Sequence, residues 1–148
     1  MLDTVSVVTV VVVGLLVGVE FAVAVFVNPM LARLPGDGAL IARSDGARVL
    51  GRVMPFWYIG STILGVLWSI LAWGEPRASL VIVATALLVL SVVMSVVLLV
   101  PINNRVAAWA GGGAPDDWQD QVGKWDRYHY ARVGVLVGAF VLLVVALA

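Results

Sequence analysis

The side chains best suited to chemistry lie just before the last apolar stretch of the chain. The only histidine, His129, lies four residues after Trp125 and three residues before Arg132. On a helix that turns 100° per residue, one face about 100° wide carries Trp118, Gln121, Trp125, Tyr128, His129 and Arg132. A neutral imidazole accepts a proton near neutral pH, and a guanidinium stabilises a developing oxyanion. This face therefore predicts a ligand site in which an aromatic surface adjoins an imidazole and a guanidinium.

The same side chains also have an ordinary structural explanation. Tryptophan and tyrosine are common at membrane boundaries, and a basic side chain at a helix end reaches toward the headgroups. This explains each residue singly, but boundary residues do not need to share a face. The periodicity leaves Lys124, Asp126 and Arg127 outside the face, where we expect them to contact water. We therefore predict an inward-facing polar cluster.

A second ionisable group lies deep within the first apolar stretch. Glu20 precedes Asn28 by eight residues, which is about 12 Å of helix. An ionisable group at such a depth is costly unless it is functional or paired. Asn103 ends the third apolar stretch and Trp57 lies near the start of the second. We predict that these residues meet His129 in one aromatic-lined ligand pocket.

The elements that position these residues are expected to be membrane helices. Hydrophobic residues make up 62% of the 148 residues and charged residues 12%, which is too apolar for a soluble domain. Each of four apolar stretches approaches the ~20 residues that cross a bilayer as a helix. We predict an all-α integral membrane four-helix bundle, a single domain over 1–148, with spans at about 5–27, 55–73, 78–100 and 131–148.

The basic residues predict how this bundle is oriented. With four spans, both termini and the turn containing Arg77 lie on one side, and the other eight of the nine Lys and Arg lie on the opposite side. Basic residues favour the cytoplasmic side. We therefore predict a multi-pass protein of the cell membrane with both termini outside and the long loops 28–54 and 101–131 in the cytoplasm.

The two long loops are expected to contain structure of their own. Residues 29–54 mix Pro, Gly and Asp with regularly spaced apolar residues. This pattern predicts short amphipathic helices lying along the cytoplasmic surface. In the second loop, the three glycines 111–113 predict a break in the chain.

Small residues at a spacing of four predict close helix packing. Gly14 and Gly18 have this spacing in the first stretch, and Gly134 and Gly138 have it in the last. Ser61 and Gly65 form a weaker pair of small residues. We favour packing within one bundle, and contact between copies in a homo-oligomer is the alternative.

Composition and residue content exclude several classes of function. A formal net charge of zero provides no basic field for nucleic acid, and the absence of cysteine removes disulfides and thiolate metal sites. A single histidine is a poor basis for a zinc or haem site. We expect no metal and no cofactor. The expected partners are the lipid bilayer and a hydrophobic aromatic small molecule.

In its motifs, the chain resembles the anthrone oxygenase-like family of small four-helix membrane proteins. The resemblance rests on Val27-Asn28-Pro29, on Pro101-Ile102-Asn103-Asn104, and on Trp118 followed by Trp125-xxx-His129-xx-Arg132. In layout it covers nearly the whole chain. Many members have asparagine where this chain has His129.

This resemblance implies an oxygenase that uses no metal or flavin and converts an anthrone to a quinone with dioxygen. The substrate becomes its own electron source once it is deprotonated to an enolate. The implied roles are His129 as base, Arg132 and Asn103 as partners of the enolate, Trp125 and Tyr128 as stacking surfaces, and Glu20 as the group that orients them.

Two other functions remain open. An accessory subunit of a larger membrane complex would need the small-residue contacts and would have only a structural polar cluster. A small proton-coupled transporter would use Glu20 as its proton carrier.

Overall fold

The computed structural model describes residues 1–35 and 37–148, with the backbone but not the side chains of residues 110–112. Helix is the only regular structure of these residues, which confirms the predicted all-α class. The first long helix comprises α1 (Leu2–Ala22), the π-helical turn η1 (Val23–Val27) and α2 (Asn28–Leu31). The second is α3 (Gly38–Leu71). The third comprises α4 (Ala78–Met94), the π-helical turn η2 (Ser95–Leu99) and α5 (Val100–Gly112), and the fourth is α6 (Trp118–Leu147).

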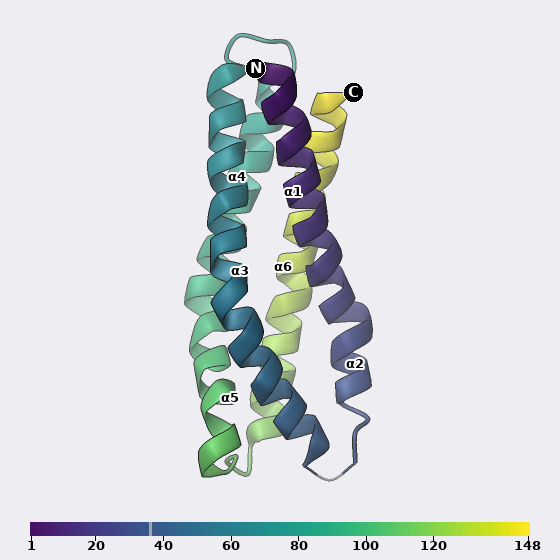
Figure 1. The fold of residues 1–148 in the computed structure, drawn as a ribbon, viewed down its shortest axis with the longest axis vertical. Coiled ribbons are helices and arrows are strands. Elements are labelled where there is room, and N and C mark those ends of the chain that lie inside the picture. The colour runs from purple at the N-terminus through teal and green to yellow at the C-terminus, as the bar shows by residue number, and fades with distance from the viewer. Residues whose placement is uncertain (36) are drawn as a thin grey trace.

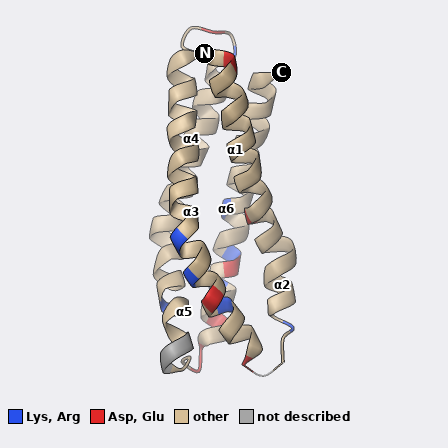
Figure 2. Cartoon of the chain, viewed as in Figure 1, with Lys and Arg blue, Asp and Glu red and all other residues tan. Residues whose placement is uncertain are grey.

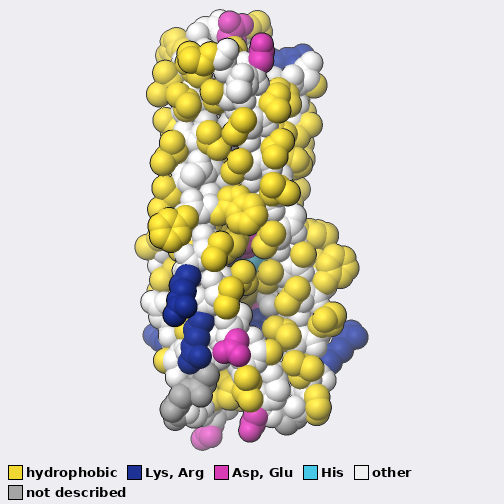
Figure 3. All heavy atoms as spheres, in the orientation of Figure 1, with side chains coloured by type: hydrophobic (Ala, Val, Ile, Leu, Met, Phe, Trp, Pro, Cys, Tyr) yellow, Lys and Arg dark blue, Asp and Glu magenta, His cyan; other side chains and the backbone are white. Residues whose placement is uncertain are grey.

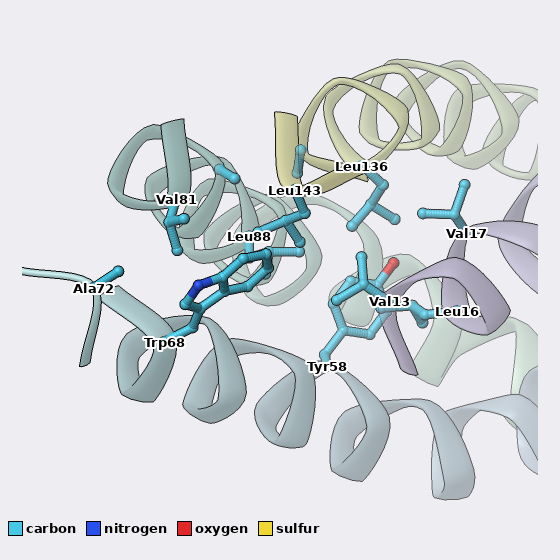
Figure 4. Close-up of a cluster of buried hydrophobic side chains, with 12 residues drawn as sticks. Val13, Leu16, Val17, Tyr58, Trp68, Ala72, Val81, Leu88, Leu136 and Leu143 are labelled. Atoms are coloured by element: carbon cyan, nitrogen blue, oxygen red, sulfur yellow. The ribbon is translucent and has the colours of Figure 1, made fainter. Parts of the chain in front are cut away.

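The four long helices lie side by side along one axis, with the two chain termini at the same end (Figure 1). α1 packs against α3 and α6, and α4 packs against the same two helices. Each of the four is long and apolar enough to cross a membrane. In the half nearest the termini, the interior is filled by interlocking aliphatic side chains, of which Leu16, Leu88, Leu136 and Leu143 are fully buried (Figure 4).

The helices extend well beyond the hydrocarbon layer at the end opposite the termini. They contain 30 to 34 residues, or about 45–51 Å of helix, whereas the hydrocarbon layer is about 30 Å thick. Charged residues gather at this end, and the opposite half carries them only near its tip (Figure 2). The charged loop residues are therefore mostly part of the long helices.

This extension differs from the predicted surface helices. Residues 38–54 form the first half of α3, which passes through Pro55 without a break and packs against α5. α5 continues from α4 through Gly112, and the chain turns at Gly113 with a φ of +83°. Ile102 and Val106 of α5 are buried with Ala47 of α3 packed against them, whereas Ile41, Val49 and Val53 of α3 are exposed.

Both π-helical turns end two residues before a proline. The Asn28 N–H donates to the Val23 carbonyl before Pro29, and the Val100 N–H donates to the Ser95 carbonyl before Pro101. Proline has no N–H, and its ring crowds the carbonyl four residues back. A wider turn relieves that crowding by inserting one residue, and it also redirects the side chains around it.

The glycine pairs contribute unequally to helix packing. A Cβ at Gly18 or Gly134 would have no neighbour within 4 Å, whereas a Cβ at Gly14 would lie 3.0 Å from the Phe140 ring. The tightest contact is at Gly65 in α3, where a Cβ would lie 2.8 Å from Thr85 Oγ1 in α4. The weaker predicted pair, Ser61 and Gly65, thus contains the closest approach.

Two glycines of α3 provide a matched test of this packing. Gly65→Ala should lower the free energy of unfolding by about 1–3 kcal/mol, because the added methyl overpacks the contact with α4. Gly60→Ala meets open space and should raise stability by up to ~1 kcal/mol through helix propensity. Thermal unfolding in detergent measures both. Equal effects of the two substitutions would contradict the close approach at Gly65.

Candidate functional site

A buried ion pair joins the first and last long helices. Glu20 in α1 is 3% exposed, and Arg132 in α6 is 7% exposed. Arg132 Nη2 donates to Glu20 Oε2 over 2.7 Å. Neither charge would be tolerated alone in an apolar span, so each residue accounts for the presence of the other.

His129 completes this cluster. Its Nε2 lies 3.2 Å from the Glu20 backbone carbonyl, and its Nδ1 lies 3.0 Å from Arg132 Nη2 and 3.2 Å from Glu20 Oε2. In the neutral ring, a proton on Nε2 satisfies both sides: Nε2 donates to the carbonyl and Nδ1 accepts from Arg132. The proton-accepting atom of His129 is therefore Nδ1, and a proton placed there would face the Glu20 carboxylate.

Residues from the other two long helices contact the guanidinium, and a residue of α6 itself stacks on the imidazole. Arg132 Nη1 donates to Ser95 Oγ over 2.8 Å, and the guanidinium carbon lies 5.0 Å from the centre of the Tyr58 ring. The Trp125 ring stacks on His129 at a centroid distance of 4.7 Å. Every long helix thus contributes to one cluster, defined by Glu20, Tyr58, Ser95, Trp125, His129 and Arg132 and called here the polar cluster.

Ser95 and Tyr58 were not predicted as site residues. Ser95 follows Ser91 by four residues in an otherwise apolar helix, a spacing that indicates a polar face at this depth. Tyr58 adjoins Trp57, which was the aromatic residue predicted instead. Neighbouring residues on a helix point about 100° apart, so the choice between them depended on how α3 is rotated.

A cavity of about 280 Å³ extends from the polar cluster between α3 and the η2–α5 segment. Its size is close to the lower limit of ligand pockets, about 300 Å³. The cluster forms one end, and the walls are mainly aliphatic, including Val23, Met54, Val92 and Leu99. Histidine and acidic side chains are just visible between apolar ones near the middle of the face in Figure 3.

Four predicted binding residues do not line this cavity: three aromatic residues and Asn28. Trp57 Nε1 donates to the Val12 carbonyl over 3.1 Å, on the side of the hydrophobic core. Trp118 and Tyr128 pack instead with a small group of buried aliphatic residues, Ile102, Val106 and Val122. The helical face predicted for α6 was too wide, because α5 covers one edge of it.

Asn28 and Asn103 lie on the charged side of the cavity. Asn28 Nδ2 donates to Asp126 Oδ1 over 2.9 Å, so its partner is Asp126 and not Glu20. Asn103 Nδ2 donates to the Ala47 carbonyl over 3.1 Å, and the residue borders both the large cavity and a smaller one of about 80 Å³.

Asp126, which was predicted to face water, is only partly exposed and has a partner that the prediction missed. Arg43 of α3 binds it through two hydrogen bonds of 2.8 Å, one to each carboxylate oxygen. This two-pronged pair is mostly buried and holds the extension of α3 against α6. Lys124 and Arg127 are exposed, as predicted.

The polar cluster retains unused hydrogen-bonding capacity. Within the described residues, the Tyr58 hydroxyl and Arg132 Nε are buried and have no hydrogen-bond partner. Both short contacts of the Glu20 carboxylate involve Oε2. An unsatisfied buried donor costs about 1–3 kcal/mol, so a ligand oxygen that accepted from these donors would recover part of that cost. No three His, Asp or Glu side chains of the described residues lie close enough to share a metal ion.

Comparison with known proteins identifies one family. A family model described as Anthrone oxygenase matches residues 47–142, which is more than half of the 148 residues. The matched range contains His129 and Arg132, whereas Glu20 and Asn28 lie before it. No curated protein and no solved structure matches the chain.

The pair of Arg43 and Asp126 can be tested by removing one partner. Asp126→Ala should lower the free energy of unfolding by about 3 kcal/mol, because it leaves the Arg43 charge buried and unpaired. Lys124→Ala, an exposed change in the same helix, should alter it by less than about 0.5 kcal/mol. The double variant Arg43→Met with Asp126→Leu should recover most of the lost free energy of unfolding. A double variant as unstable as Asp126→Ala alone would contradict this assignment.

Proposed function

Since the chain belongs to the anthrone oxygenase family, we propose that it is a membrane-embedded oxygenase that oxidises an anthrone-type polycyclic aromatic with dioxygen, using no metal or flavin. The observation that carries this proposal is the polar cluster at one end of an apolar cavity. Such a cavity holds a flat hydrophobic molecule, and the cluster supplies a proton acceptor and a cation next to it.

The proposed reaction balances without an external reductant. Anthrone and O₂ give anthraquinone and water. Removal of a proton from the methylene carbon forms a delocalised enolate, whose electrons reduce dioxygen as a carbon–oxygen bond forms at that carbon. The peroxide anion takes back the abstracted proton to become a hydroperoxide. The remaining hydrogen of that carbon and the terminal OH group then leave as water, which gives the second carbonyl group.

The polar cluster accepts the proton removed from the substrate and stabilises the negative charge of the enolate. His129 Nδ1 takes the proton and then shares it with Glu20 Oε2, which is 3.2 Å away. A protonated Nδ1 no longer accepts from Arg132, and the guanidinium becomes available to the enolate oxygen, where charge stabilisation lowers the barrier. Trp125, stacked on His129, extends a flat aromatic surface along the cavity.

The two other functions make different use of these residues. A proton-coupled transporter would have to break the 2.7 Å contact between Glu20 and Arg132 in each cycle. If the chain is an accessory subunit, the purified protein does not have to catalyse a reaction. The unpartnered donors of Tyr58 and Arg132 suit a ligand oxygen, which an accessory subunit would not need.

Activity can be tested with purified protein in lipid nanodiscs. Anthrone in air, with metal ions chelated, should form anthraquinone faster than in empty nanodiscs. His129→Ala should slow the reaction by about 10²–10⁴-fold, the usual contribution of a general base. Arg127→Ala is an exposed control on the same helix and should leave the rate unchanged. Circular dichroism confirms that each variant is folded. No acceleration by the wild-type protein over empty nanodiscs would contradict the proposed activity.

We also propose that both termini lie outside the cell and the charged ends of the long helices lie in the cytoplasm. This placement follows from the excess of basic residues in the two long loops. The chain contains no cysteine. Labelling of a single introduced cysteine therefore shows on which side of the membrane that position lies. In intact cells, an impermeant maleimide should label Glu75→Cys and should label Arg33→Cys only after permeabilisation. The reverse pattern would overturn the orientation.

A further inference from the structure

We propose that the cavity receives its ligand directly from the lipid phase, through an opening between α3 and the η2–α5 segment that Ile59 and Val96 flank. The occupant is the planar, membrane-dissolved aromatic of the proposed function, which enters with its oxygen at the leading edge. This inference takes the ligand class from the proposed function, and the route follows from the cavity itself.

The exposed part of the cavity lining defines the opening. Ile59 in α3 is 53% exposed and Val96 in η2 is 61% exposed, although both line the cavity. The lining residues of α1 and α6, by contrast, include the buried Glu20, His129 and Arg132. The cavity therefore reaches the surface on the side of α3 and η2, and its polar end lies inside the bundle.

At Ile59 and Val96 the opening lies at the level of the acyl chains. Toward Gly51 and Asn104, which also line the cavity and are exposed, it approaches Arg52 and Arg105. Arg52 precedes Ile59 by seven residues and Arg105 follows Val96 by nine, so the nearest charges of these helices are about 10–14 Å away along the helix axis. Other exposed apolar residues lie on the same two long helices, among them Phe56 and Val93. A surface of this kind is solvated by lipid in a membrane protein.

The inner end selects against a lipid acyl chain as the occupant. An acyl chain has no oxygen to accept from the Tyr58 hydroxyl or from Arg132 Nε, both buried and without a partner among the described residues. It would also leave the paired charges of Glu20 and Arg132 in contact with hydrocarbon only. An aromatic ketone or phenol meets both requirements, since its rings contact the aliphatic walls and its oxygen accepts at the polar cluster.

Bulky substitutions at the opening test the route. Val96→Trp and Ile59→Trp should obstruct it. Val97→Trp and Ile63→Trp are matched controls, because these residues are 62% and 61% exposed and line neither cavity. The probe is a photoactivatable azidoanthraquinone added to nanodiscs, and mass spectrometry identifies the labelled peptides. We expect label on cavity-lining residues of the wild type, an initial labelling rate about tenfold lower in Val96→Trp and Ile59→Trp, and wild-type rates in both controls.

The alternative results are distinct. Equal rates in Val96→Trp and Val97→Trp would overturn the route, as would label confined to the smaller cavity around Asn28 and Arg43. Preferential labelling of the cavity by a lipid that carries a diazirine in its acyl chain would overturn the ligand class. Labelling requires no turnover. Cavity labelling without anthrone oxidation would therefore support this inference while it contradicts the proposed activity.

Discussion

The arrangement of the bundle depends on the burial of one carboxylate, that of Glu20, in an apolar span. Arg132 neutralises it from the last long helix, over 2.7 Å. Removing one member of such a pair typically costs 3–5 kcal/mol, whereas replacing both members by apolar residues is often neutral or stabilising. Stability alone therefore does not explain why the pair is present. The contacts of Arg132 with Ser95 and Tyr58 join the remaining two long helices to the same point.

The two halves of the bundle meet different requirements. Toward the termini, fully buried leucines and the close approach at Gly65 pack the helices tightly. Toward the other end, the π-helical turns before Pro29 and Pro101 interrupt the regular helices at the level of the polar cluster, and the cavity lies beside η2. Below the cavity, the paired charges of Arg43 and Asp126 hold the extensions together. The tightly packed half thus provides a rigid support for a site that leaves room for a ligand.

The sequence predicts the helices and the polar residues better than it predicts how each helix is rotated. Apolar length reveals the four spans, and a buried glutamate requires a partner, so Glu20, His129 and Arg132 could be placed together in advance. Trp57 was chosen over Tyr58 because composition does not show which neighbour faces inward. Asp126 seemed exposed because its partner, Arg43, lies 83 positions earlier, and periodicity within one helix carries no information about such a contact.

The most direct test of a ligand oxygen at the polar cluster is the infrared carbonyl stretch of ¹³C-labelled anthraquinone bound to the protein in nanodiscs. Hydrogen bonds from the Tyr58 hydroxyl and the Arg132 guanidinium weaken the carbonyl bond. The bound carbonyl should therefore absorb at a lower frequency than the same molecule in empty nanodiscs, and Tyr58→Phe should reverse part of that shift. A frequency identical to that in lipid alone, at full occupancy of the cavity, would contradict this role of the polar cluster.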